Sequence, residues 1–282
     1  MNDVAITGGK RTRGRAPQRG AGPLVSIVTI VYNGAATIER TIQSVLAQQW
    51  LGIEYVIVDG GSTDGTIEII KRYDDRIDFW CSARDNGIYD AMNKGVALCT
   101  GDWVGLINAD DWYAPDAVQR AMAVADDATI NIMHGDIMIH YPNGAQKVKC
   151  PRRNGFLLRY WEMVLNHPSF FVRRAYYADH AFDPAMRVGG DHQWTLRAWL
   201  ETPTQFHYLP VVLAHFSAGG ASMVIPLAKA LKESDAMYRN LGMGSVHRLI
   251  GRLVKVALFL PQALKLRANQ FLAPLPHTAP DE

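Results

Sequence analysis

The sequence predicts an α/β fold: a doubly wound sheet, mixed but mainly parallel and flanked by helices, followed by a C-terminal helical extension. Two patterns indicate it. Over residues 24–111, short apolar runs rich in Val and Ile, typical of strands buried on both faces, alternate with segments whose apolar residues recur at helical spacing. From residue 225 onward the spacing is helical, with a break at 241–244.

The first half predicts four buried strands joined by helical crossovers. We expect strands at 24–31, 55–58, 77–80 and 103–107, and helices at 38–46, from 67 onward and at 88–98. This order implies parallel pairing, and ligands bind such sheets at the carboxyl ends of the strands. The polar segments that follow these strands therefore form the candidate site.

The second half is less regular. Pro142-Asn143-Gly144 separates residues 130–141 from 145–149, which indicates a hairpin. The other elements expected are helices at 156–164 and 191–200 and strands at 168–172 and 211–216.

Three segments follow from composition. Residues 1–22 are rich in Gly, Arg and Pro and are expected to be a disordered basic tail, 23–222 form the α/β domain, and 223–282 form the helical extension. The tail carries a formal charge of +4 and the whole chain +2, so the remainder is slightly acidic and no nucleic-acid partner is expected.

The three cysteines, without C-x-x-C spacing, favour a reducing compartment and no zinc site. No apolar segment has the form of a signal peptide or a membrane span. We therefore expect a cytoplasmic protein, located at most peripherally at the inner face of the plasma membrane.

The segment Asn108-Ala109-Asp110-Asp111 follows a buried strand. Two adjacent carboxylates repel each other, and a divalent cation such as Mg²⁺ or Mn²⁺ removes that cost while keeping positions open for phosphate oxygens. The alternative is a solvated turn before Pro115.

Two further loops follow strands in the same half. Asp59 ends a strand and can accept a hydrogen bond from a base, while the glycines after it allow close approach of a flat ligand. The loop matches neither phosphate-binding glycine motif, and it could simply cap the next helix through Ser62, Thr63 or Asp64. Asp85-Asn86-Gly87 is either a turn or a ligand contact.

Four motifs in this order resemble the family 2 glycosyltransferases, which have the GT-A fold. They are VSIVTIVYN at 25–33, VDGGSTDGT at 58–66, DNGIYDAMNKG at 85–95 and LINADD at 106–111. The resemblance implies a donor half at 23–125, an acceptor half at 126–222 and a nucleotide-sugar donor. It assigns Asp59 to the base, Asp110 and Asp111 to a DxD-type metal site, and the other donor contacts to Thr29, Tyr32, Asn33, Asp85, Asn86, Lys94 and Asn108. Asn108 stands where many members carry the first Asp of that site.

The segment 189–194 resembles the family's Glu-Asp segment, with Gly190 in place of the Glu. The resemblance makes Asp191 the general base of an inverting reaction; the alternative is a helix cap, and Asp183 is the close competitor. His215 resembles a late histidine that some members give to the metal, and His167 one near the acceptor, although either could be a core or surface residue.

The resemblance implies a hexosyltransferase-type enzyme that uses a divalent metal and transfers a sugar with inversion from a nucleotide sugar, with UDP favoured. The acceptor would be a hydroxyl of a glycan or lipid-linked molecule of the bacterial surface-polysaccharide type. A sugar nucleotidyltransferase would carry basic residues in the loop after the first strand, which 32–36 lacks. A non-catalytic nucleotide-sugar binding or scaffold protein would be expected to have lost Asp110, Asp111 or Asp191, and all three are present.

Residues 246–267 combine apolar residues with five basic ones. This pattern is typical of a helix lying on anionic lipid, and it equally fits a helix packed on the catalytic domain.

Overall fold

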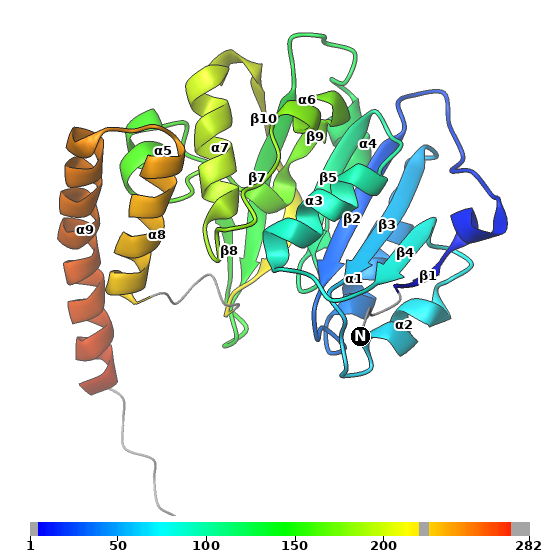
Figure 1. Ribbon diagram of the computed structural model, residues 1–282, viewed down its shortest axis with the longest axis horizontal. Helices are drawn as coiled ribbons and strands as arrows, with labels where there is room; N and C mark the ends of the chain where they lie inside the picture. The colour runs from blue at the N-terminus through cyan, green and yellow to red at the C-terminus, as the bar shows by residue number, and fades with distance from the viewer. Residues whose placement is uncertain (1–4, 220–225, 272–282) are drawn as a thin grey trace, which may run out of the picture.

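The computed structural model describes residues 5–219 and 226–271 (Figure 1). Within these ranges lies one ten-stranded mixed sheet of order β1-β4-β3-β2-β5-β9-β7-β10-β6, with β8 paired to β7. The longest ladders, β7–β10, β2–β3 and β2–β5, are parallel. The predicted mixed, mainly parallel sheet is therefore confirmed.

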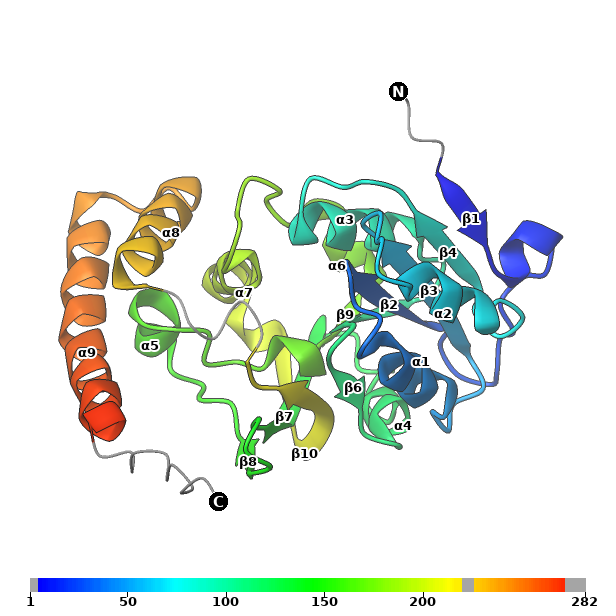
Figure 2. The same ribbon diagram turned by 90° about the horizontal axis from the view of Figure 1, so that it is seen from below.

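The elements of the first half lie close to the predicted positions. They are β2 (Val25–Val31), α1 (Ile38–Leu46), β3 (Ile53–Asp59), α2 (Thr66–Arg72), β4 (Phe79–Ser82), α3 (Ile88–Leu98) and β5 (Trp103–Asn108). Alternate residues of β2 enter different cores: Ile27 belongs to the core that contains residues of α1 and α4, and Val28 to the core that contains residues of α3 and α7. Helices cover both faces, as Figure 2 shows.

The second half contains β6 (Trp112–Tyr113), α4 (Ala117–Met122), β7 (Ile132–His140), β8 (Gln146–Lys149), α5 (Gly155–Tyr160), β9 (Phe171–Arg173), α6 (Arg174–Asp179), α7 (Gly190–Glu201) and β10 (Phe206–Ser217). Short 3-10 turns lie at His167–Ser169 and Pro203–Gln205. The hairpin is confirmed, with Gly144 at φ +82°. β9 lies antiparallel between β5 and β7, which makes the sheet mixed. The sequence pattern did not predict β6, α4 or α6, because each is only two to six residues long.

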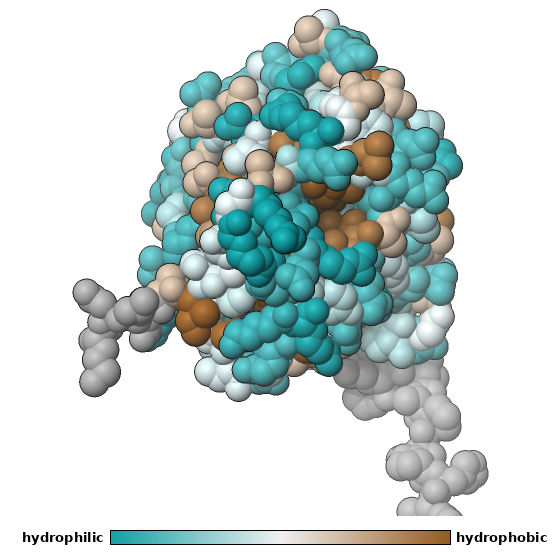
Figure 3. All heavy atoms as spheres, turned by 90° about the vertical axis from the view of Figure 1, so that its right-hand side faces the viewer, coloured by the Kyte–Doolittle hydropathy of each residue, from teal (hydrophilic) through white to brown (hydrophobic). Residues whose placement is uncertain are grey.

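The disorder predicted for residues 1–22 is wrong for those that the structure describes. β1 (Ile6–Gly8) pairs antiparallel with β4, and a 3-10 turn follows at Lys10–Arg13. Lys10 pairs with the buried Asp78 at 2.8 Å, and Arg11 with the buried Glu54 at 3.2 Å. The segment is ordered by strand pairing and by buried carboxylates, neither of which requires apolar composition. Figure 3 shows this end of the molecule, where the surface is mostly hydrophilic.

The C-terminal extension forms α8 (Leu227–Asn240) and α9 (Ser245–Phe271), with the predicted break between them. α9 packs on α8 and α5, and within the described ranges the protein has no helix with the length and apolarity needed to span a membrane. Three of its basic residues contact other parts of the protein: Arg248 and Arg252 contact Asp235, and Lys255 Nζ donates to the Trp161 carbonyl at 2.6 Å.

Candidate functional site

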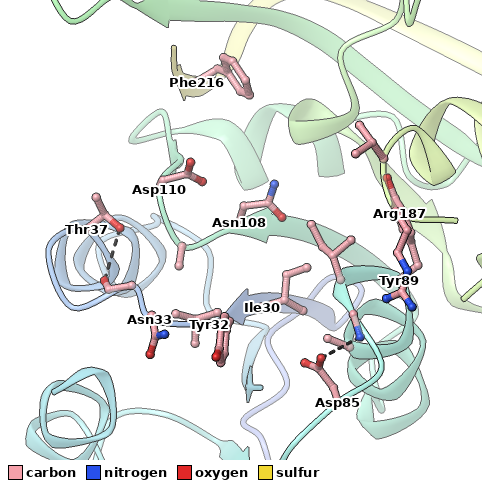
Figure 4. Close-up of a pocket in the computed structure, with 17 residues that line it drawn as sticks. Ile30, Tyr32, Asn33, Thr37, Asp85, Tyr89, Asn108, Asp110, Arg187 and Phe216 are labelled. Carbon is pink, nitrogen blue, oxygen red and sulfur yellow. Dashed lines mark hydrogen bonds between the residues drawn. The ribbon is translucent and has the colours of Figure 1, made fainter. Parts of the chain in front are cut away.

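A cavity of about 630 Å³ opens at the carboxyl ends of β2 and β5. The start of α3, the loop before α7 and Phe216 of β10 complete its wall (Figure 4). Five residues predicted to bind the donor line it: Tyr32, Asn33, Asp85, Asn108 and Asp110. The parallel register of β2 with β5 brings these strand ends to one edge.

A second cavity of about 640 Å³ adjoins the first and shares Tyr32, Asp85 and Gly87 with it. Its wall contains the glycines after β3, Ser62, and Arg84 after β4. Ile6 of β1 also lines it, so the N-terminal segment is part of the site. No feature of the sequence near Ile6 indicated this role.

Asp59 orders a loop and does not face either cavity, contrary to its predicted contact with a base. It is fully buried, and its carboxylate accepts hydrogen bonds from the backbone N–H groups of Gly61 and Ser62 and from the hydroxyls of Ser62 and Ser82. Asp85 stands at the cavities instead. Its Oδ2 lies 2.5 Å from the point that a Cβ at Gly60 would occupy, so Gly60 makes room for this carboxylate.

Three other predicted donor contacts lie outside the cavity linings. Thr29 is buried in the core at 3.0 Å from the Tyr55 hydroxyl, because β2 is buried on both faces. Lys94 pairs with Asp90 at 2.8 Å, one helical turn away. The backbone carbonyl of Asn86 accepts a hydrogen bond from the Arg187 guanidinium.

Asn33 joins two loops at the cavity edge. Its N–H donates to Ser62 Oγ at 2.7 Å, and its side-chain oxygen accepts from the Thr63 N–H at 2.9 Å. With φ at +50°, Asn33 adopts the left-handed conformation that Asn tolerates better than most residues. The contacts fix the loop after β2 against the loop after β3.

In the acidic pair Asp111 is fully buried and Asp110 is half-buried, and their charges are incompletely neutralised. Burial raises the pKa of Asp110; for Asp111, burial and then the charge of Asp110 raise the pKa well above its usual range. Asp111 Oδ1 accepts from the Ser217 N–H at 3.0 Å, while Oδ2 has no partner among the described residues. Arg40, on α1, donates to the Asp110 carbonyl at 2.8 Å and stacks on Trp112. Such an acid pair suits a cation.

His215 is separate from this pair, contrary to the prediction that it joins them at a metal. Its Nδ1 lies 2.9 Å from His140 Nε2, and its ring stacks on Trp112. In the described part of the chain no cluster of three His, Cys, Asp or Glu side chains is arranged to hold a metal. The backbone N–H of Ser217, two residues later on β10, is what reaches Asp111.

Asp191 lies in the first turn of α7, where its Oδ1 accepts from the Tyr89 hydroxyl at 3.3 Å. Tyr89 lines the first cavity, so Asp191 is one side chain away from it. A Cβ at Gly190 would lie 2.7 Å from the Tyr89 ring, which explains why glycine occupies that position.

The competitor Asp183 is engaged structurally. Its Oδ1 accepts from the Ala185 N–H at 2.9 Å and its Oδ2 from Asn240 Nδ2 at 2.6 Å. His167 is buried between Phe170 and Phe182 and does not line the first cavity. Trp194 also lies in the core.

The residues at the site that were not predicted include Arg40, Tyr89 and Arg187. Tyr89 lies inside the motif at 85–95, two residues after the turn Asp85-Asn86-Gly87, and membership of that motif was the available signal. Arg40 and Arg187 reach the site only through tertiary contacts.

Comparison with known proteins gives a consistent result. The family described as "Glycosyl transferase family 2" matches residues 26–182. An uncharacterized glycosyltransferase of Mycobacterium tuberculosis is 30% identical over 80% of this chain and 85% of its own length. A PGL/p-HBAD biosynthesis glycosyltransferase of Mycobacterium bovis is 29% identical over 84% of this chain and 93% of its own length.

Solved structures share the fold. TarS of S. aureus in complex with UDP superposes with a TM-score of 0.57 at 18% identity, covering 80% of this chain and 68% of TarS. A mannosyltransferase from Pyrobaculum calidifontis in complex with GDP-Man and Mn²⁺ gives 0.60 at 18% identity, covering 92% and 78%. The expected GT-A-type fold is therefore confirmed.

Proposed function

Because the chain belongs to glycosyl transferase family 2 and is a glycosyltransferase, we propose that it transfers a sugar from a nucleotide-sugar donor bound across the two adjoining cavities. The observation that carries this proposal is the arrangement of carboxylates. Asp85 stands where the cavities meet, and Asp110 lies with Asn108 at the far side of the first. A nucleoside diphosphate needs a polar group at its base and a cation at its phosphates.

The second cavity is the proposed base site. Asp85 Oδ1 accepts from the Gly87 N–H at 2.8 Å, and Oδ2 faces the space above Gly60. A carboxylate oxygen there would accept an imide N–H, which uracil, thymine and guanine present and cytosine does not. We favour a UDP-sugar; the UDP and GDP-Man bound to the neighbours named above are compatible with this edge pattern.

The acidic pair fits a divalent cation such as Mg²⁺ or Mn²⁺, because Asp111 Oδ2 is buried without a partner among the described residues and Asp110 is partly desolvated. Asp110 and Asp111 would hold the ion, with Asn108 beside them and phosphate oxygens completing the shell. A bound ion would offset the charge that develops on the departing diphosphate. His215 is omitted from this proposal.

Asp191 is the proposed general base. The acceptor hydroxyl oxygen forms a bond to the anomeric carbon while the bond from that carbon to the diphosphate oxygen breaks, and the hydroxyl proton passes to Asp191. One displacement inverts the anomeric configuration, and no covalent sugar–enzyme intermediate is needed. Tyr89 donates to Asp191 and thereby directs its carboxylate.

The proposed acceptor is a hydroxyl of a glycan or glycolipid. Relatives named for PGL/p-HBAD biosynthesis and succinoglycan biosynthesis support it. α9 would bring the enzyme to a lipid surface, since Val246, Leu249 and Leu253 are 67%, 58% and 62% exposed at helical spacing. Arg248 and Lys255 contact groups of the protein, so the face formed by Val246, Leu249 and Leu253 is mainly apolar.

A thermal-shift panel of nucleotide sugars with Mn²⁺ or EDTA tests the donor and the ion together. A donor at 100 times its dissociation constant should add about 2.7 kcal/mol to the free energy of unfolding, with the gain reduced in EDTA. Donor hydrolysis in the same samples separates an enzyme from a non-catalytic binder. No stabilisation by any UDP-, GDP- or dTDP-sugar would contradict the proposal.

Flotation with liposomes tests the lipid contact. The double variant Leu249→Ser/Leu253→Ser should lose lipid binding, whereas Leu51→Ser, which alters a leucine that is 78% exposed elsewhere, should not. Equal flotation of all three proteins would remove α9 from the proposal.

A further inference from the structure

Arg187 is the sole cationic side chain among the residues that line the first cavity. It comes from the loop before α7 and stands across the cavity from Asp110 (Figure 4). No carboxylate of the described residues forms an ion pair with it. Its Nη1 donates a hydrogen bond to the Asn86 carbonyl at 3.1 Å. Because a guanidinium has five N–H donors, most of them are available to a ligand.

The structure holds this guanidinium at the cavity. Asn86 anchors one end of it, and Gly87 leaves room beside it: a Cβ at Gly87 would lie 3.3 Å from Nη1. Gly87 also has φ at +118°, a conformation that side chains rarely adopt. Arg187 therefore connects the loop before α7 to the start of α3, on the wall that also carries Tyr89.

The charges of the side chains that line the cavity indicate what Arg187 could bind. Asp85 and Asp110 line the cavity, so an anionic ligand would meet two carboxylates and one compensating side chain. We infer that Arg187 binds a phosphate group of the ligand in this cavity, on the side opposite the acidic pair. Arg suits the task because its planar fork matches two phosphate oxygens at once.

The identity of the ligand as a nucleoside diphosphate rests on the proposed function; the anion site does not. Two sources of phosphate share this chemistry: the diphosphate of the donor and a phosphate on the acceptor. Arg187 lies four residues before Asp191, the proposed base, so either source would place a phosphate close to the transferring sugar.

Calorimetry on the full chain with Mn²⁺ distinguishes these cases. The probes are uridine, UDP, guanosine, GDP and inorganic pyrophosphate, and inorganic phosphate added to UDP-saturated protein. The variants are Arg187→Gln, Arg187→Lys and the control Lys147→Gln, which removes an exposed charge on β8 outside both cavity linings. Melting temperatures verify that each variant is folded.

We expect Arg187→Gln to weaken UDP binding by roughly 10- to 100-fold, Arg187→Lys to weaken it less, and uridine binding to stay unchanged. Unchanged UDP binding with loss of phosphate binding to the UDP-saturated protein would assign Arg187 to the acceptor. If the wild type binds pyrophosphate in a way that depends on Arg187 but binds no nucleotide, the anion site is supported and the proposed function is contradicted. Binding of every anion within twofold of wild type in Arg187→Gln, or no anion binding by the wild type, overturns the inference.

Discussion

Replacing Asp191 by Asn tests the proposed chemistry most directly. The change is nearly isosteric and leaves an oxygen that can still accept from the Tyr89 hydroxyl, now 3.3 Å from Oδ1. Because that bond has a neutral donor, losing the charge should cost the fold no more than about 1 kcal/mol. The amide cannot take the acceptor's proton, so turnover should fall by on the order of 10²–10⁴. That factor corresponds to about 2.7–5.4 kcal/mol of activation free energy.

The assay compares turnover, donor affinity and stability on the same preparations. Donor affinity should stay nearly constant, because Asp191 does not line the donor cavity. Asp183→Asn is the matched control: it alters a nearby carboxylate that is held by Ala185 and Asn240. This control should lose some stability and keep its turnover. Tyr89→Phe should lower kcat by about 3- to 30-fold with little effect on KM, since it removes one hydrogen bond that positions the base.

Two results would refute the reasoning. Loss of donor binding in Asp191→Asn would make Asp191 a donor ligand or a structural residue. Wild-type turnover in Asp191→Asn, with a loss in Asp183→Asn, would transfer the role of base to Asp183.

Three further predictions concern the acidic pair, the N-terminal segment and a buried histidine. Asp111→Asn should abolish transfer and the stabilisation by Mn²⁺ with donor while the metal-free protein stays folded; full activity, or wild-type activity that survives EDTA, would count against the site. Arg11→Met should lower the free energy of unfolding in urea by about 1.5–3 kcal/mol, which is less than the loss of a fully buried ion pair. The cost is smaller because Arg11 is 27% exposed and Ser26 and Thr100 still donate to Glu54, and a further Glu54→Gln should recover part of it. A cost below about 0.5 kcal/mol would show that the segment is not anchored there. Burial lowers the pKa of His134 to about 3, below its value near 6.5 in the unfolded chain. Between these two pH values the unfolded state binds more protons than the folded state, so the free energy of unfolding decreases as the pH is lowered. Between pH 7 and pH 5 this group should remove about 2 kcal/mol, and His134→Leu should unfold with that much less acid sensitivity; equal sensitivity in both proteins would contradict the assignment.

The order of elements and the location of the site could be predicted from the sequence. The period of the apolar residues is a local property, so β2, α1 and α3 were found within one residue of their ends. Since parallel strands place their carboxyl ends at one edge, Asn33, Asp85 and Asp110 could be expected to converge without knowledge of the sheet order.

The N-terminal segment shows where composition misleads. Its Gly and Arg content is typical of disorder, yet its charges pair with Asp78 and Glu54, buried carboxylates far along the chain. A partner 43 or more residues away leaves no periodic signal in the segment itself.

The roles of single side chains at the site were decided by the tertiary structure. Asp59 and Asp85 both follow strands and look equivalent in sequence, but the Ser62 and Ser82 hydroxyls surround Asp59, while Gly60 opens a space for Asp85. Ser217, not His215, reaches Asp111, because the contact is made by the backbone N–H of Ser217, whereas the His215 ring lies against His140 and Trp112. Sequence spacing thus determined which loops meet, since this follows from local periodicity and strand direction. Register and long-range hydrogen bonding determined which atoms of those loops face a ligand, because they depend on partners that lie far apart in the chain.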